Sequence, residues 1–236
     1  MNSVIIVAAG SSRRMGFDKI FASLLGKPVL YWSIAAFQEC KDVDEIVIVT
    51  RADRIAEVEK LVAAEKLTKV RTVVEGGAER HISVWNGLRV TGSEGCQFVA
   101  IHDAARPLIT PKLISECFEL AREHGSACCA SPIPDTVKRA SYELLVTDDV
   151  DRKNLWAMQT PQVFSSALIM QAYASLMARH ELVTDEVSAV QKLGKRVALL
   201  ENDDYNFKIT FPRDLPMAEQ VIDIRLGREK GRGGKA

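Results

Sequence analysis

Short apolar runs alternate with amphipathic stretches along most of this chain, and that alternation constrains the fold more than any other feature. The apolar runs are rich in β-branched residues, and the first two are nearly continuous, as expected of strands that are covered on both faces. The expected strands are residues 3–8, 45–50, 70–74, 98–102, 127–132 and 196–201. The expected helices are residues 28–40, 53–65, 79–90, 111–124, 165–178, 185–193 and 213–226.

This order of elements predicts an α/β fold, a doubly wound and mostly parallel sheet. Pro28, Pro111 and Pro212 stand at or next to three of the helix starts, where a missing N–H costs nothing. Sheets of this kind bind ligands beyond the carboxyl ends of their strands. Functional residues are therefore expected in the loops that follow the strands.

The balance of charge limits the class of partner. The chain has 236 residues with 31 basic and 31 acidic side chains, so its formal net charge is zero. Proteins that bind polyanions carry a large positive excess, so no nucleic-acid partner is expected. Residues 228–236 are Gly-rich and basic and are expected to form a disordered tail. The body, residues 1–227, is expected to be a single domain with 27 basic and 30 acidic residues, a net charge of −3.

Membrane and secretory signals are missing from the sequence. No stretch reaches the roughly 20 apolar residues that span a bilayer, and residues 4–9 are too short for a secretory signal. The five cysteines form no Cys-x-x-Cys pair, and their odd number fits free thiols in a reducing cytosol. We therefore expect a cytoplasmic protein with no membrane partner.

The segment 134–156 breaks the alternation. It contains no long apolar run and is rich in charged side chains, so it predicts a long solvated hairpin or loop. Loops of this length in compact domains usually serve function or assembly.

Two small-residue turns could approach phosphate or a base. Residues 8–16 read Ala-Ala-Gly-Ser-Ser-Arg-Arg-Met-Gly after the first expected strand, where backbone N–H groups can contact phosphate oxygens. They match neither the Walker loop nor Gly-x-Gly-x-x-Gly, so a dehydrogenase is disfavoured. Residues 76–83 read Gly-Gly-Ala-Glu-Arg-His-Ile-Ser, and Arg80 and Ser83 share one helical face. Each turn alone could equally be an ordinary turn before a helix.

Charged residues follow two further apolar segments. Residues 102–107 read His-Asp-Ala-Ala-Arg-Pro, and a carboxylate such as Asp103 at a strand end is well placed to hold Mg²⁺. Arg106 could bind a second anion, or the two side chains could be only a local ion pair. Near the end of the chain, residues 207–210 alternate as a short strand would, which would fix Lys208 before the final helix.

These motifs occur in order with four others across nearly the whole chain. The others are Lys19, Asp-Thr-Val-Lys from Asp135, Thr-Pro-Gln from Thr160 and Thr-Asp-Glu from Thr184. Together they resemble the motifs of the 2-C-methyl-D-erythritol 4-phosphate cytidylyltransferase family, CTP-using enzymes of non-mevalonate isoprenoid biosynthesis. The resemblance implies a Rossmann-like fold of nucleotidyltransferase type with a protruding β-arm, and Mg²⁺ as cofactor.

The resemblance also implies roles for individual residues. The residues that would flank the reacting α-phosphate are Arg14, Lys19 and Lys208. The residues that would bind CTP are Ala8, Ala9, Gly10, Ser11, Ser12, Arg13, Gly16, Gly76, Arg80, Ser83 and Ala104. Asp103 would bind the metal. The residues that would line the methylerythritol phosphate site are Arg106, Thr136, Arg152, Thr160 and Thr184, together with Lys208. Residues 133–157 resemble an arm that reaches into a second subunit of a homodimer, so Thr136 and Arg152 would serve the partner's site.

The chain departs from the family pattern at three places. The family often has Gly at the position of Ser12 and an acidic residue at that of Ala78, and it often has Pro-Lys-Gln where this chain reads Asp18-Lys19-Ile20. The change around Lys19 affects the conformation of the loop that carries this lysine more than the charge of the loop.

Two other functions remain open from the sequence. A ribitol 5-phosphate cytidylyltransferase would look alike at the CTP turn, but the Ala-Ala pair after Asp103 and the segment 135–139 match the methylerythritol group better. A non-catalytic nucleotide-binding module is opposed by the presence of both Lys19 and Lys208, because a binder needs no cations at the reacting phosphorus.

Overall fold

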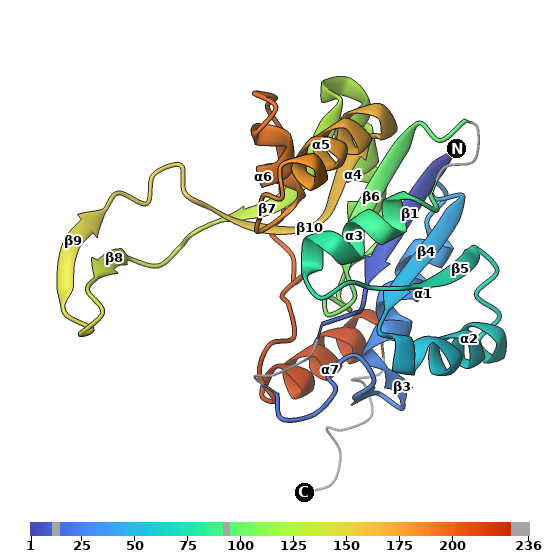
Figure 1. Ribbon diagram of the computed structural model, residues 1–236. Coiled ribbons are helices and arrows are strands. Elements are labelled where there is room, and N and C mark those ends of the chain that lie inside the picture. The colour runs from blue at the N-terminus through green and yellow to red at the C-terminus, as the bar shows by residue number, and fades with distance from the viewer. Residues whose placement is uncertain (11–14, 92–94, 228–236) are drawn as a thin grey trace, which may run out of the picture.

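The computed structural model describes residues 1–10, 15–91 and 95–227. Within them, seven strands form one sheet in the order β11-β7-β10-β6-β1-β4-β5 (Figure 1). Parallel pairing joins β5, β4, β1 and β6, and also β7 and β11, whereas β10 pairs antiparallel with both β6 and β7. The strands of the sheet are β1 (Asn2–Val7), β4 (Glu45–Thr50), β5 (Val70–Glu75), β6 (Phe98–Asp103), β7 (Ser126–Pro132), β10 (Trp156–Ser165) and β11 (Ala198–Glu201).

Helices cover both faces of the sheet, because side chains that alternate along each strand point to opposite faces. Val4 and Ile6 of β1 pack with α1, α2 and α4, whereas Ile5 packs on the other face with α3, α5 and α6. The helices are α1 (Val29–Glu39), α2 (Ile55–Ala64) after a short turn η1 (Ala52–Arg54), α3 (Arg80–Leu88), α4 (Pro111–His124), α5 (Ser166–Ala178), α6 (Glu186–Gln191) and α7 (Asp214–Arg225).

The expected α/β fold with a mostly parallel, doubly wound sheet is confirmed. The six strands and seven helices expected from the alternation are each present within a few residues of their predicted bounds. Two expectations need correction. The strand β10 was not predicted, because Pro161 and the polar residues around it interrupt its apolar pattern. Conversely, no strand forms at 207–210: Ile209 N donates to Ala105 O (2.8 Å) and Thr210 N to a carboxylate oxygen of Asp214 (2.7 Å).

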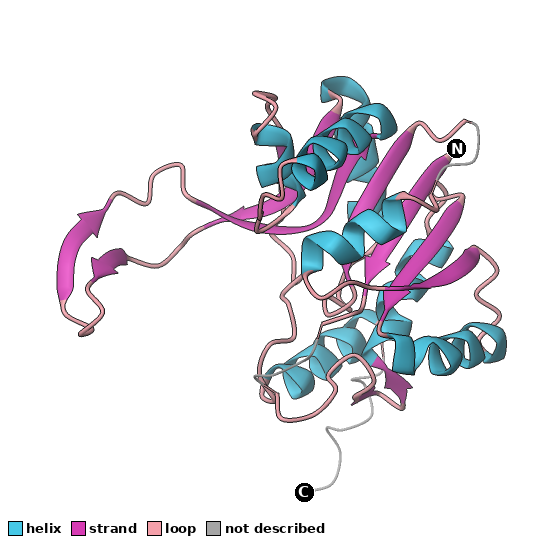
Figure 2. Cartoon of the chain, viewed as in Figure 1, coloured by secondary structure: helices cyan, strands magenta, loops and turns pink. Residues whose placement is uncertain are grey.

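The segment 134–156 contains an antiparallel hairpin of β8 (Val137–Ala140) and β9 (Val146–Val150). Figures 1 and 2 show that this hairpin stands away from the seven-stranded sheet on two extended connections. It is joined to the rest of the chain through β7 and β10. A smaller hairpin, β2 (Ser23–Leu24) with β3 (Lys27–Pro28), precedes α1.

Parallel pairing places the carboxyl ends of β1, β4, β5 and β6 along one edge of the sheet. The loops that follow β1, β5 and β6 carry the residues that the sequence singles out for chemistry. Among the helices in the described part of the chain, none is long and apolar enough to cross a membrane.

Candidate active site

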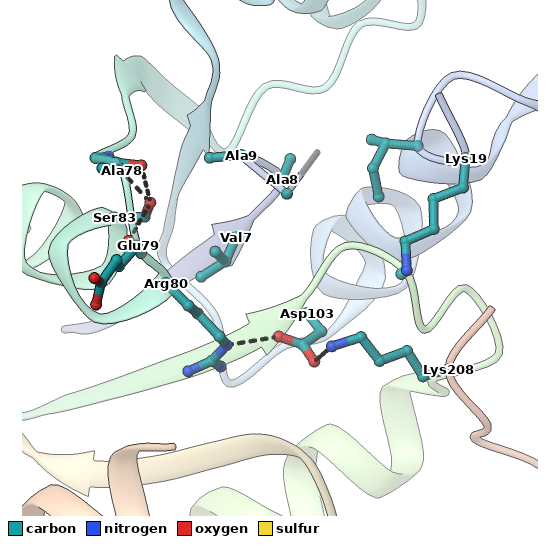
Figure 3. Close-up of a pocket in the computed structure, with 14 residues that line it drawn as sticks. Val7, Ala8, Ala9, Lys19, Ala78, Glu79, Arg80, Ser83, Asp103 and Lys208 are labelled. Carbon is teal, nitrogen blue, oxygen red and sulfur yellow. Dashed lines mark hydrogen bonds and ion pairs between the residues drawn. The ribbon is translucent and has the colours of Figure 1, made fainter. Parts of the chain in front are cut away.

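A cleft of about 320 Å³ opens at this edge of the sheet (Figure 3). Five separate segments of the chain form it: the end of β1, the segment before β2, the turn into α3, the end of β6 and the loop before α7. The predicted site residues that line it are Ala8, Ala9, Gly10, Lys19, Arg80, Ser83, Asp103 and Lys208. Residues that lie more than 100 positions apart in the sequence therefore meet in one cavity.

Asp103 is the central charge of the cleft. One of its carboxylate oxygens accepts from Arg80 Nε at 3.2 Å and the other from Lys208 Nζ at 2.7 Å (Figure 3). Burial alone would raise the pKa of this carboxyl, but Arg80 and Lys208 outweigh burial and hold the pKa well below its usual range. Asp103 is thus ionised, half enclosed by cations and placed at the end of a parallel strand.

Arg80 is held from its other side by Glu186, the first residue of α6. The guanidinium makes a bidentate pair with the Glu186 carboxylate, with distances of 2.5 Å from Nη1 and 3.0 Å from Nη2. Glu186 is fully buried and also accepts from the Tyr173 hydroxyl at 2.9 Å. Burial lowers the pKa of Arg80, but the charges of Glu186 and Asp103 outweigh that effect and raise it overall. Arg80 is therefore a fixed cation.

The glycine turn before α3 packs directly on the turn after β1. A Cβ on Gly76 would lie 2.5 Å from Ala9 Cβ, so only glycine fits there without a shift of the backbone. The Ser83 hydroxyl accepts from Gly77 N at 3.1 Å and donates to Glu79 O at 3.1 Å, which fixes the turn from inside. Gly76 shapes the cleft wall, and Ser83 lines it while holding the turn.

Lys19 enters the cleft from the side opposite α3 (Figure 3). Its Nζ donates to Ile209 O at 2.8 Å, next to Lys208 in the chain. Two lysines that lie far apart in the sequence are thus brought to neighbouring positions on the cleft wall.

Arg106 and Thr160 lie behind Asp103 and do not line the cleft. Arg106 donates to Asn206 O (2.8 Å) and Met158 O (3.4 Å), while its buried Nε has no partner among the described atoms. Burial lowers the pKa of this guanidinium. The buried Thr160 hydroxyl accepts from Asp103 N at 3.1 Å and lies 3.0 Å from His102 Nδ1.

His102 is fully buried beside this pair. Burial lowers the pKa of the imidazole to about 3, because its effect is larger than that of the Asp103 charge, which raises the pKa. The ring is therefore neutral at physiological pH and acts in packing and orientation, as one expects of a histidine inside a strand.

Three further predicted residues, all within the described ranges, lie outside the cleft lining. Ala104 is buried beneath it, and Gly16 is exposed with a φ of 72°, a conformation that favours glycine. Thr184 is exposed just before α6, with its hydroxyl 3.2 Å from Ser188 Oγ. Ser11, Ser12, Arg13 and Arg14 belong to the residues outside the described ranges, as does the basic tail 228–236.

Thr136 and Arg152 lie on the hairpin arm. Both are exposed, and they line one groove beside β8 and β9, where Arg152 donates to Pro134 O. In Figure 1, β8 and β9 stand far from β1, β6 and α3, the elements whose ends line the cleft. A single chain therefore does not bring these two residues to Asp103.

Two carboxylates line the cleft, those of Asp103 and Glu79. Glu79 lies 3.3 Å from His81 Nδ1 and points away from Asp103 (Figure 3), so Asp103 is the carboxylate available to a metal ion beside the lysines. Among the described residues there is no group of three or more His, Cys, Asp or Glu side chains that could enclose a metal. Mg²⁺ commonly keeps several waters and binds one or two carboxylates together with substrate phosphates. A single ionised Asp103 beside a phosphate-sized cavity suits such a substrate-bridged ion.

Sequence reasoning missed Glu186 and Tyr173 as parts of this site. Glu186 closes the Thr-Asp-Glu motif, and a carboxylate at the start of an apolar helix was the available signal. Nothing in the sequence pairs it with Arg80, because 106 positions separate them.

Comparison with known proteins agrees with this architecture. A sequence model of the family IspD, 2-C-methyl-D-erythritol 4-phosphate cytidylyltransferase, matches residues 2–223. A protein of that name from Caldanaerobacter subterraneus subsp. tengcongensis is 42% identical over 224 residues, which cover 93% of this chain and 98% of the relative.

Two crystal structures share the fold along nearly the whole chain. The 2-C-methyl-D-erythritol 4-phosphate cytidylyltransferase of Thermus thermophilus superposes with a TM-score of 0.75 at 32% identity, covering 93% of this chain and 97% of that one. The 4-diphosphocytidyl-2C-methyl-D-erythritol synthase of Anaerococcus prevotii gives a TM-score of 0.82 at 27% identity, covering 94% and 96%. The chain thus belongs to the 2-C-methyl-D-erythritol 4-phosphate cytidylyltransferase family of nucleotidyltransferases.

Proposed function

We propose that the cleft around Asp103 is where this chain joins CTP to 2-C-methyl-D-erythritol 4-phosphate, giving 4-diphosphocytidyl-2-C-methyl-D-erythritol and pyrophosphate. The observation that carries the proposal is the convergence of Lys19, Arg80, Asp103 and Lys208 beside a small-residue turn at the end of β1. Such a turn lets backbone N–H groups reach phosphate oxygens, and the cations oppose the charge of a triphosphate.

The reaction needs positioning more than acid–base chemistry. The phosphate of the sugar attacks the α-phosphorus of CTP in line, a P–O bond forms, and the bond to pyrophosphate breaks. A phosphate dianion is already a competent nucleophile, so no general base is required. Lys19 and Lys208, with Arg14 from outside the described ranges, would hold the two anions together and offset the charge that builds up at the α-phosphate.

Asp103 is the residue we assign to Mg²⁺. Asp103 would help to hold the ion, which would supply further positive charge at the phosphates. Arg80 and Lys208 each contact one of the two Asp103 carboxylate oxygens. Because Glu186 retains Arg80, Lys208 is the cation best able to leave Asp103 for a substrate phosphate.

The nucleotide and the sugar phosphate would occupy different sides of the cleft. On the α3 side, Gly76, Arg80 and Ser83 would hold the cytosine and ribose, next to the turn that starts at Ala8. We assign Arg106, Thr160, Thr184 and Lys208 to the methylerythritol phosphate; of these, Lys208 lines the cleft. Arg106 and Thr160 would act there from behind Asp103.

A homodimer would complete the sugar-phosphate side. Thr136 and Arg152 share a groove on an arm that stands away from its own cleft, so their charge and hydroxyl are available to a second chain. The tip of the arm exposes four apolar side chains, Tyr142, Leu144, Leu145 and Val146. An isolated monomer rarely leaves such a cluster in water. We propose that the partner subunit covers the tip and receives Thr136 and Arg152 in its site.

The proposal also includes a cytoplasmic location and excludes two classes of partner. All five cysteines are free thiols, which fits a reducing cytoplasm. The cations converge in a cavity sized for small phosphate esters, so the proposal includes neither a nucleic acid nor a membrane as partner.

The direct test is pyrophosphate release from CTP and Mg²⁺ with either methylerythritol phosphate or ribitol 5-phosphate. We expect rapid release with the first and little with the second. An equal or reversed preference would assign the chain to the ribitol substrate instead. Release with neither sugar, alongside tight CTP binding, would favour a nucleotide-binding module.

A further inference from the structure

Asp18, the residue before Lys19, is held by two arginines from the end of β4. Arg51 Nη2 lies 2.6 Å from one Asp18 carboxylate oxygen, and Arg54 Nε lies 3.3 Å from the same oxygen. The Asp18 side chain is 16% exposed, so the pairs are shielded from water on most sides. Pairs that are partly buried and share one carboxylate are worth more than isolated surface pairs.

Asp53 is the second carboxylate beside these two arginines, and it is far more exposed than Asp18. Asp53 also lies near Arg51 (3.2 Å) and Arg54 (3.8 Å), but its side chain is 67% exposed. Asp53 belongs to η1, the same turn as Arg54, and its recorded ion pairs are with these two arginines. The hydrogen bond from Arg51 to Asp18 raises the pKa of Arg51, ahead of the opposing effect of burial and the smaller effect of Asp53.

The cluster also fixes the backbone on both sides of Lys19. Arg51 Nη1 donates to Gly10 O at 3.4 Å, within the turn after β1. Asp18 O accepts from Phe21 N at 3.2 Å, and the Arg54 guanidinium lies 4.8 Å from the centre of the Phe21 ring. The chain on which Lys19 sits is thereby attached to β4 and η1 by a carboxylate, a carbonyl and an aromatic ring.

We propose that Asp18, clamped by Arg51 and Arg54, is a positioning residue that sets the pose of Lys19 in the cleft. Lys19 reaches the far wall, where it donates to Ile209 O at 2.8 Å, so a small rotation of its segment would move Nζ away from Lys208. A displacement of about 1 Å at a reacting group can cost on the order of 10²-fold in rate. The proposal rests on the proposed role of Lys19 at the α-phosphate.

The test begins with Asp18→Asn, which keeps the size of the side chain and removes its charge. We expect kcat to fall by ~10- to 100-fold, with a much smaller change in the KM for CTP, because Lys19 acts on the reacting phosphate. Asp53→Asn is the matched control, since it removes the exposed carboxylate from the same two arginines. It should leave kcat within about twofold of wild type. An Asp18→Asn enzyme with wild-type kcat would refute the proposal.

A double mutant separates positioning of Lys19 from a general structural effect. If Asp18 acts through Lys19, then Asp18→Asn combined with Lys19→Ala is no slower than Lys19→Ala alone. Fully additive losses would overturn the proposal. Arg51→Gln tests the clamp from its other side, and it should show the same selective loss of kcat even where Asp18→Asn folds poorly.

Amide hydrogen exchange gives a readout that does not depend on catalysis. The Phe21 amide should exchange faster in Asp18→Asn than in wild type or Asp53→Asn, whereas amides of β1 and β6 should be unchanged. Equal protection at Phe21 would count against the clamp. If Lys19→Ala alone keeps full activity, the role of Lys19 in the proposed function fails, and faster Phe21 exchange would still show that the clamp orders the segment.

Discussion

The surroundings of Asp103 show how a chain of zero net charge can gather cations in one cavity. The single negative charge of this carboxylate is met by Arg80 and Lys208, and Lys19 enters the same cleft, so the wall carries more cations than anions before any phosphate binds. The net charge of the chain therefore limits which partners its whole surface can bind, but it does not predict the charge of one pocket.

At this scale, Lys208→Ala should remove nearly all turnover and leave the fold intact. Lys208 is partly exposed and pairs with Asp103, so its loss removes a preorganised cation but little packing. We expect kcat to fall by ~10²–10³-fold with an unchanged circular dichroism spectrum. Lys112→Ala is the matched control, because Lys112 is an exposed lysine at the start of α4. A Lys208→Ala enzyme with near-normal kcat would disprove the assigned role.

The buried pair of Arg80 and Glu186 makes a second prediction, about stability. Glu186 is fully buried, so removing Arg80 leaves its charge without a cation, which costs about 3–5 kcal/mol. Removing Glu186 costs less, because Arg80 is partly exposed and keeps Asp103 as a partner. We expect Arg80→Gln to lower the free energy of unfolding by a few kcal/mol and Glu186→Gln to lower it by less, and the double mutant to lose much less than the sum.

The measurement is chemical denaturation of all four proteins in the cycle. Tyr173→Phe serves as the control, because it removes a hydrogen bond to Glu186 but no charge. It should cost only about 1 kcal/mol. Additive losses in the double mutant would show that the two charges do not depend on each other for burial.

At the scale of elements, the sequence predicts the strands and helices whose positions follow from the local order of apolar and polar residues. Continuous apolar runs predicted the parallel strands, and Pro111 predicted the start of α4, where the Thr110 side chain caps the helix. Pattern did not predict β10, whose place between β6 and β7 depends on pairing with strands distant in the sequence. It wrongly predicted a strand at 207–210, because alternation alone does not provide a pairing partner.

In the candidate site, too, local groupings of residues could be predicted and contacts between distant elements could not. Residues within one motif, such as Gly76 and Ser83, could be predicted together because they share a turn. The pairing of Arg80 with Glu186, and the clamp on Asp18, depend on side chains from different elements. Such contacts form only when the sheet has formed. The sequence therefore identifies candidate residues but does not predict which side chains they pair with.

The contact between the two turns gives a prediction for these elements. Gly76→Ala would place a Cβ 2.5 Å from Ala9 Cβ, so either the β5–α3 turn or the β1 turn must move. We expect a loss of about 1–3 kcal/mol in the free energy of unfolding, together with weaker CTP binding. Calorimetric titration with CTP and thermal unfolding would measure the two effects.

Gly10→Ala provides the steric control for stability. A Cβ at Gly10 would meet no atom within 4 Å among the described residues, so the free energy of unfolding should be unchanged. A Gly76→Ala protein as stable as Gly10→Ala would show that the two turns are not tightly packed.

At the scale of the whole molecule, the arm is the feature that one chain leaves unexplained. Its groove carries Thr136 and Arg152, and its tip carries exposed apolar side chains. A dimer in which each arm completes the other subunit's cleft accounts for both features at once.

Arg152→Ala should therefore raise the KM for methylerythritol phosphate far more than the KM for CTP. The guanidinium would bind the sugar phosphate through charge-assisted hydrogen bonds, whereas CTP would bind on the α3 side of the cleft in the proposed arrangement. Steady-state kinetics with each substrate varied in turn would measure the split. Arg139→Ala, which removes an exposed arginine from β8 of the same arm, is the control. Equal increases in the two KM values would place Arg152 outside the sugar-phosphate site.

The most direct measurement mixes two defective chains, Lys208→Ala and Arg152→Ala, at a low concentration of methylerythritol phosphate. In a mixed dimer with exchanged arms, one cleft carries both defects and the other carries neither. After random subunit exchange, pyrophosphate release should recover to about a quarter of the wild-type rate, because half of the dimers are mixed and each has one intact site. If each arm served its own chain, or if the chains acted alone, mixing would give no activity beyond that of the two variants measured separately.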